Sequence, residues 1–92
     1  MGLSLGLAAC AGAPVQEMSN ARQAIKAARE AAGPATSAPA SLIEAETLLN
    51  RAEDNLQKRA YKQARRDAIA ARGKAAEALS STRTVDDRNG AS

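Results

Sequence analysis

The chain has 92 residues and a formal net charge of +3, with no Phe, no Trp and no His, and Tyr61 as its single aromatic residue. This length supports at most one domain, and the absence of His excludes Ser-His-Asp and Cys-His catalysis. The weak positive charge is not typical of nucleic-acid-binding proteins. Ala fills 24 positions, and because Ala is the best helix former, we expect an all-α fold.

The first ten residues are small and apolar and lead into the single Cys of the chain. Leu7-Ala8-Ala9-Cys10 resembles a bacterial lipobox, in which the Cys is acylated and becomes the first mature residue. No Lys or Arg precedes Cys10 and the apolar run is short, so residues 1–9 are interpreted as a signal-peptide remnant or as the end of a longer leader. The alternative is an N-terminal end with an incidental Cys.

An acylated Cys10 would anchor the protein stably in the membrane, because several acyl chains bind a bilayer firmly whereas a single chain binds it only marginally. Residues 10–14, which contain Gly12 and Pro14, are expected to form a lipid-anchored tether. The residue after the Cys is Ala11, and by resemblance to Gram-negative lipoproteins the lack of Asp there indicates the periplasmic side of the outer membrane.

The first predicted helix covers residues 15–32. Its apolar positions recur at steps of 3 or 4, which is the spacing of one helix face: Val15, Met18, Ala21, Ile25, Ala28 and Ala32. Pro14 fits the first turn, and Gly33 followed by Pro34 provides a stop.

The second predicted helix covers residues 39–58, with Ser37 or Ala38 as its N-cap. Its stripe is the most apolar part of the mature chain and comprises Leu42, Ala45, Leu49, Ala52 and Leu56, widened by Ile43 and Leu48. The expected packing residues are Leu42, Leu49 and Leu56, together with Tyr61 at the junction with the next helix.

The third predicted helix covers residues 61–81 and carries Tyr61 followed by a stripe of small residues, Ala64, Ala68, Ala71, Ala75 and Ala78. No Gly or Pro separates it from the second helix, but the stripe changes phase after Leu56, which favours an antiparallel αα hairpin over one long bent helix. Residues 15–81 therefore form the expected helical domain, and residues 82–92 are expected to be a disordered tail.

Charge also favours the hairpin, since residues 39–58 are net acidic and residues 61–81 are net basic. Antiparallel packing would place the two helices side by side. Each exposed ion pair contributes less than about 1 kcal/mol, so charge biases orientation more than stability.

Taken together, the lipobox, the run Ala38-Pro39-x-x-Leu42-x-x-Ala45-Glu46-x-x-Leu49 and the motif Tyr61-x-x-Ala64 resemble a family of small, Ala-rich bacterial envelope lipoproteins. That family is classed as a domain of unknown function, and its members occur alone or before an OmpA-like domain. The hairpin is also similar to tetratricopeptide-like helical pairs. Family members often place Gly-Asp before the Tyr, where this chain has Arg59-Ala60.

The residues offer little for catalysis or for a cofactor. Neighbouring carboxylates such as Glu44 and Glu46 diverge around a helix, so neither a metal site nor an enzyme activity is predicted. Basic residues of the third helix, Lys62, Arg65, Arg66 and Arg72, are candidate contacts to an anionic surface. The alternative is a solvated face that the acidic helix balances.

The Ala stripes predict association, because they bury little area and leave a small core marginal on its own. The expected function is a non-catalytic envelope lipoprotein that acts as a helical interaction or structural module. We expect a membrane contact through the anchor and a protein partner or self-association, but no nucleic acid and no small-molecule substrate. The alternatives are a murein-lipoprotein-like tether without covalent linkage and a tetratricopeptide-like adaptor that binds proteins.

Overall fold

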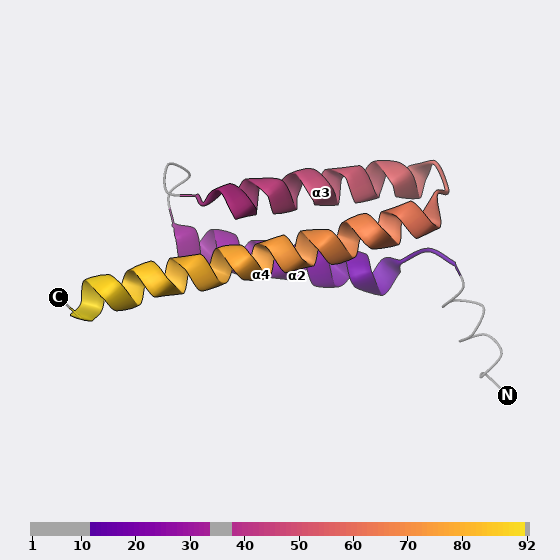
Figure 1. Ribbon diagram of the computed structural model, residues 1–92. Helices are drawn as coiled ribbons and strands as arrows, with labels where there is room; N and C mark the ends of the chain where they lie inside the picture. Colours follow the sequence, from indigo (N-terminus) through magenta and orange to yellow (C-terminus); the bar gives the residue numbers. More distant parts are fainter. Residues whose placement is uncertain (1–11, 34–37, 92) are drawn as a thin grey trace, which may run out of the picture.

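The computed structural model describes residues 12–33 and 38–91, with side-chain surroundings as far as Thr82. It contains three helices, α2 (Val15–Ala32), α3 (Ala40–Gln57) and α4 (Tyr61–Ala91), and within the described residues there is no strand. Figure 1 shows α3 and α4 lying side by side as an antiparallel hairpin, with α2 behind α4, and α2 packs on both of the other helices. The predicted all-α class and the hairpin are confirmed.

Helix α2 has the bounds that the sequence predicted. Pro14 is its N-cap rather than a residue of the first turn, and the Pro14 carbonyl accepts the Met18 amide at 3.0 Å. Gly33 ends the helix with a φ of 76°, a backbone conformation that favours Gly because it has no Cβ.

Helix α3 begins one residue later than predicted and ends one residue earlier. Neither of the two residues expected at its N-cap holds that place: Ala38 lies outside the cap and Ser37 lies outside the described residues. Pro39 is the N-cap, since its carbonyl accepts the amides of Leu42 and Ile43. Pro is suited to this boundary because its φ is fixed and it has no amide to leave unsatisfied.

The turn between α3 and α4 is a Schellman motif without glycine. The Ala60 amide donates to the Asn55 carbonyl at 2.8 Å, and the Arg59 amide donates to the Leu56 carbonyl at 3.0 Å. Arg59 has a φ of 63°. The two helices are therefore separate, and the motif uses Arg where the resembling family often has Gly.

Helix α4 continues ten residues past the predicted end at Ser81, so the tail expected to be disordered is helical as far as Ala91. Between Thr82 and Asn89 there is neither Gly nor Pro to break the helix, and the Thr, Asp and Asn residues there lower helix propensity only modestly. The Thr82 hydroxyl donates to the Ala78 carbonyl at 3.0 Å, a local bond compatible with the helix. This end of α4 extends beyond α2 and α3 (Figure 1).

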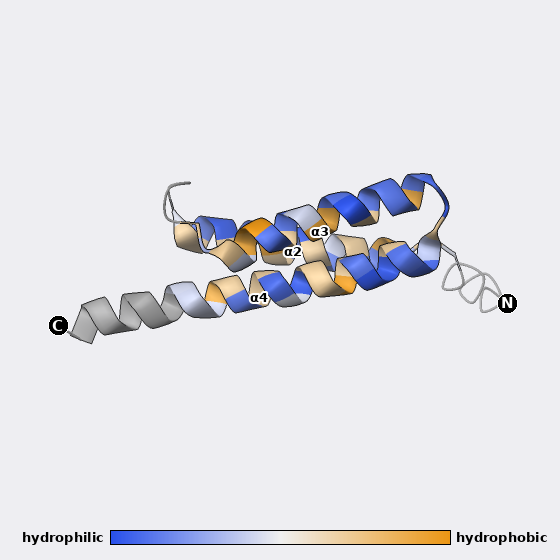
Figure 2. Cartoon of the chain, turned by 45° about the horizontal axis from the view of Figure 1, so that its top comes forward, coloured by the Kyte–Doolittle hydropathy of each residue, from blue (hydrophilic) through white to orange (hydrophobic). Residues whose placement is uncertain are grey.

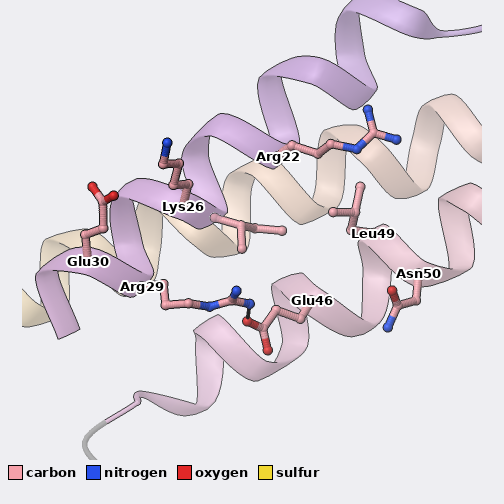
Figure 3. Close-up of a pocket in the computed structure, with 8 residues that line it drawn as sticks. Arg22, Lys26, Arg29, Glu30, Glu46, Leu49 and Asn50 are labelled. Atoms are coloured by element: carbon pink, nitrogen blue, oxygen red, sulfur yellow. Dashed lines mark ion pairs between the residues drawn. The ribbon is translucent and has the colours of Figure 1, made fainter. Parts of the chain in front are cut away.

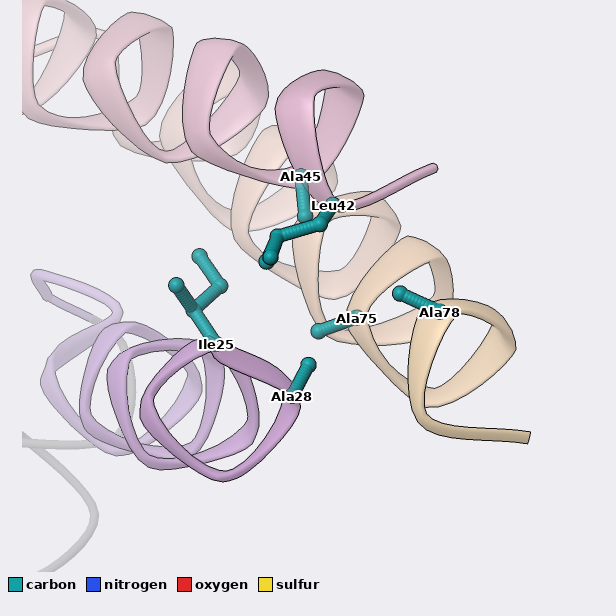
Figure 4. Close-up of a cluster of buried hydrophobic side chains, with 6 residues drawn as sticks. All are labelled: Ile25, Ala28, Leu42, Ala45, Ala75 and Ala78. Atoms are coloured by element: carbon teal, nitrogen blue, oxygen red, sulfur yellow. The ribbon is translucent and has the colours of Figure 1, made fainter. Parts of the chain in front are cut away.

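The core lies where the three predicted stripes meet. On α4 it consists of small side chains that are completely buried, namely Ala64, Ala68, Ala71, Ala75 and Ala78. Larger buried side chains come from the other two helices, with Met18 and Ile25 on α2 and Leu42 on α3. Figure 4 shows Ile25 and Leu42 pointing into the space that Ala28, Ala75 and Ala78 border. The Ala face of α4 therefore allows both partners to approach it closely.

Three large apolar residues lie mostly in solvent. Val15 is 69% exposed, and Ile43 and Ile69 are each 56% exposed. Val15 is the first residue of α2. Ile43 and Ile69 lie beside the apolar stripes of their helices rather than on them. Hydrophilic residues alternate with apolar ones along the helices (Figure 2).

The molecule measures 58 × 29 × 16 Å along its principal axes. Across the described ranges, no helix has both the length and the apolar character that crossing a bilayer requires.

Candidate functional site

The most open side of the bundle lies between α2 and α3. Both helices pack extensively on α4 and contact each other much less. A groove of about 510 Å³ follows this seam, with Ile25 and Leu49 among its lining residues and Lys26, Glu30 and Asn50 on its exposed edges. In Figure 3, charged side chains from both helices surround the groove. Its form is an apolar floor with a polar rim.

Two ion pairs join α2 to α3 along the groove. Arg22 Nη2 lies 3.3 Å from Glu53 Oε2, and Arg29 forms an ion pair with Glu46. The two Arg residues are seven positions apart, as are the two Glu residues, so the pairs repeat after two helical turns of an antiparallel packing. The sequence carried a signal for them in this matched spacing of opposite charges, but the predicted charge pairing considered only α3 and α4.

A second hollow of about 290 Å³ adjoins the first, and the two share Arg29 and Glu46. Its lining includes Ala32, Leu42 and the exposed Ile43. The Arg29–Glu46 pair therefore crosses a longer depression that follows most of the α2–α3 seam.

The expectation that acidic α3 pairs with basic α4 is correct only in small part. One ion pair joins these helices within the described residues, between Lys74 Nζ and Glu44 Oε2 at 3.9 Å. The Asn55 side chain also donates to Asp67 at 2.8 Å. Glu46 and Glu53 instead pair with Arg29 and Arg22 of α2.

The four basic residues predicted as contacts to an anionic surface differ in their surroundings. Arg65 is half-buried, with Nε 3.7 Å from Glu17 and Nη2 donating to the Gly12 carbonyl at 3.3 Å. Lys62, Arg66 and Arg72 are exposed, and none of the ion pairs between described residues involves them.

The four expected packing residues lie at the helix interfaces to different degrees. Leu42 is 2% exposed, Leu49 is partly buried against two clusters of core residues, and Leu56 is partly buried against one of them. Tyr61 is the first residue of α4 and is half-buried at the turn.

The lipobox residues Leu7, Ala8, Ala9 and Cys10 lie outside the described residues. Within the described ranges, no group of three Cys, Asp or Glu side chains converges to hold a metal ion.

A family model, Domain of unknown function (DUF4398), matches residues 16–91. The chain belongs to this family. The DUF4398 match spans all but the first residue of the three-helix unit described above and therefore includes the α2–α3 groove and the α3–α4 turn. No curated protein and no solved structure matches the chain.

Proposed function

We propose that the chain is a non-catalytic lipoprotein of the bacterial cell envelope, held by Cys10 at the periplasmic side of the outer membrane and acting there as a helical interaction module. The single observation that best supports an interaction role is the groove between α2 and α3, with its apolar floor of Ile25 and Leu49. Partly apolar concave surfaces with polar edges are typical of sites that receive another helix or peptide.

The chemistry of the interior agrees with this role. Within the described residues, every fully buried side chain is apolar, and the charged residues lie at the surface, where five ion pairs link or flank the helices. The core contains many Ala residues and few large side chains, so it gains little from burial and profits from added apolar contact with a partner.

The anchoring part of the proposal is tested by fractionating cells that express the chain and the Cys10→Ser variant. We expect the parent in the outer-membrane fraction with an acylated N-terminal mass, and the variant to lose both properties. A soluble parent protein with an unmodified N-terminus would remove the lipoprotein function.

The interaction part is tested by sedimentation of the Cys10→Ser protein across a dilution series. Asn50→Trp fills the groove from its exposed rim, whereas Gln57→Trp adds the same side chain to an exposed site of α3 outside the groove. If copies associate through the groove, Asn50→Trp shifts the protein toward monomer and Gln57→Trp does not. When the parent is monomeric at all concentrations, the same pair of variants is compared in capture of membrane proteins from the native envelope.

A further inference from the structure

The segment from Lys58 to Arg66 contains five basic residues and no acidic residue, in a chain whose net charge is only +3. It forms the α3–α4 turn and the first turns of α4 at one end of the bundle (Figure 1). Four of these residues, Lys58, Arg59, Lys62 and Arg66, are exposed, and we call them the basic pole.

Within the described part of the chain, no ion pair neutralises the basic pole. The nearby carboxylates have other partners, since Glu17 pairs with Arg65 and Asp67 accepts from Asn55. Asp54, one turn before the end of α3, is the remaining exposed acid close to this end in sequence. The pole therefore keeps an excess of positive charge that faces solvent.

The placement of these charges is unfavourable for the isolated helix. Lys62 and Arg66 are four residues apart and repel each other on one helix face. Lys62 also lies in the first turn of α4, where the helix dipole is already positive, and this turn contains no acidic residue. An anionic surface at this end would relieve both unfavourable interactions.

The start of the described chain is bound to the same end. Arg65 donates to the Gly12 carbonyl at 3.3 Å, and Arg65 adjoins Arg66 of the pole. Gly12 follows Cys10 by two residues, and two residues span at most about 7 Å in any conformation. A membrane anchor at Cys10 would therefore join the chain close to where Gly12 contacts this end of the bundle.

We propose that the basic pole binds the anionic headgroups of phospholipids and so fixes how the bundle stands on the membrane. The orientation rests on the proposed lipid anchor at Cys10, whereas the headgroup binding rests on the pole alone. In this orientation the turn between α3 and α4 faces the bilayer, and the free end of α4 points away from it along the 58 Å axis.

The test uses the full chain with Cys10→Ser, which has no lipid, and vesicles of equal parts phosphatidylglycerol and phosphatidylcholine. Each Lys or Arg near such a surface raises partition about fivefold, so Lys62→Gln with Arg66→Gln is expected to weaken binding about 25-fold. The matched control, Arg51→Gln with Arg72→Gln, removes two exposed charges that lie outside both the pole and the α2–α3 groove, so the two double variants have the same net charge. Partition of the parent should fall with added salt and be much weaker on pure phosphatidylcholine.

Equal losses of vesicle binding in the two double variants would contradict the proposal, because they would show that the membrane attracts the protein through its net charge alone. Failure of the parent to bind the anionic vesicles at low salt would overturn it as well. Circular dichroism verifies that both variants keep the parent helicity. Since this measurement needs no acylation, its failure is distinct from a failure of the anchor in cell fractionation.

Discussion

The two sides of the core are built by different means. Where α4 meets its neighbours, the contact surface consists of completely buried Ala residues, and the helices pack closely. Where α2 meets α3, large side chains such as Ile25 and Leu42 fill the centre, ion pairs cross above them, and a groove stays open. Small side chains allow close approach but contribute little buried area each. Burial of large side chains must therefore come from α2 and α3.

The largest effect expected from this difference is at Leu42. Leu42→Ala should leave a cavity and lower the free energy of unfolding by about 3 kcal/mol, because the surrounding Ala side chains are too small to fill it. Ile43→Ala is the matched control, since Ile43 is adjacent but 56% exposed, and it should change stability by less than about 0.5 kcal/mol. Urea unfolding of both variants measures the difference. Similar losses of stability in the two variants would show that Leu42 does not lie at the centre of the core.

The opposite substitution tests the α4 side. Ala75 is fully buried, so Ala75→Leu should force α2 or α3 away from α4 and destabilise the fold by about 2 kcal/mol. Ala76→Leu places the same side chain one position along, on the exposed face, and should be close to neutral. The midpoints of thermal unfolding report both effects. A neutral Ala75→Leu would mean that the Ala stripe is not needed for close packing.

The α3–α4 turn gives an effect of opposite sign. Arg59→Gly should stabilise the protein by about 1 kcal/mol, because Arg pays a steric cost at a φ of 63° that Gly avoids. Lys58→Gly is the control, since Lys58 has a φ of −82° and gains nothing from Gly there. Stabilisation by Lys58→Gly alone would contradict the Schellman geometry. Arg59 also belongs to the basic pole. The steric cost of Arg at this position is therefore consistent with a role for its positive charge.

The smallest effect is expected for the ion pairs of the seam. Both partners of the Arg29–Glu46 pair are partly exposed, so Arg29→Glu or Glu46→Arg should each cost below about 1 kcal/mol. The double exchange should recover most of that loss, and salt should reduce the differences. Double-mutant analysis of urea unfolding measures the coupling. A coupling well above about 1 kcal/mol would mean that charge, rather than Ile25 and Leu42, holds α2 to α3.

Much of the fold could be read from the periodic residues. The spacing of Met18, Ala21, Ile25 and Ala28 predicted the buried face of α2, and the phase change between Leu56 and Tyr61 predicted the hairpin. The predicted helix ends were less accurate where the sequence contains no strong capping or helix-breaking residue. Pro39 is a cap rather than a helical residue, and α4 runs to Ala91 because nothing before Gly90 breaks it.

The candidate site could not be predicted to the same extent. Arg22 and Arg29 have matching Glu residues on α3, but the sequence does not state that α2 and α3 face each other across an open seam. The bond from Arg65 to Gly12 was likewise invisible, since it joins residues 53 positions apart. Charged residues can serve several partners, and only their placement in space selects one.

The sequence by itself determined that this chain is helical, where its apolar faces lie and that its helices must pack through small side chains, because these properties depend on local propensity and period. The tertiary structure decided which helix lies at the centre, where the groove remains open and which basic residues stay unpaired, because these depend on the order in which three similar faces meet. It also decided that residues 58–66 and Gly12 share one end of the bundle.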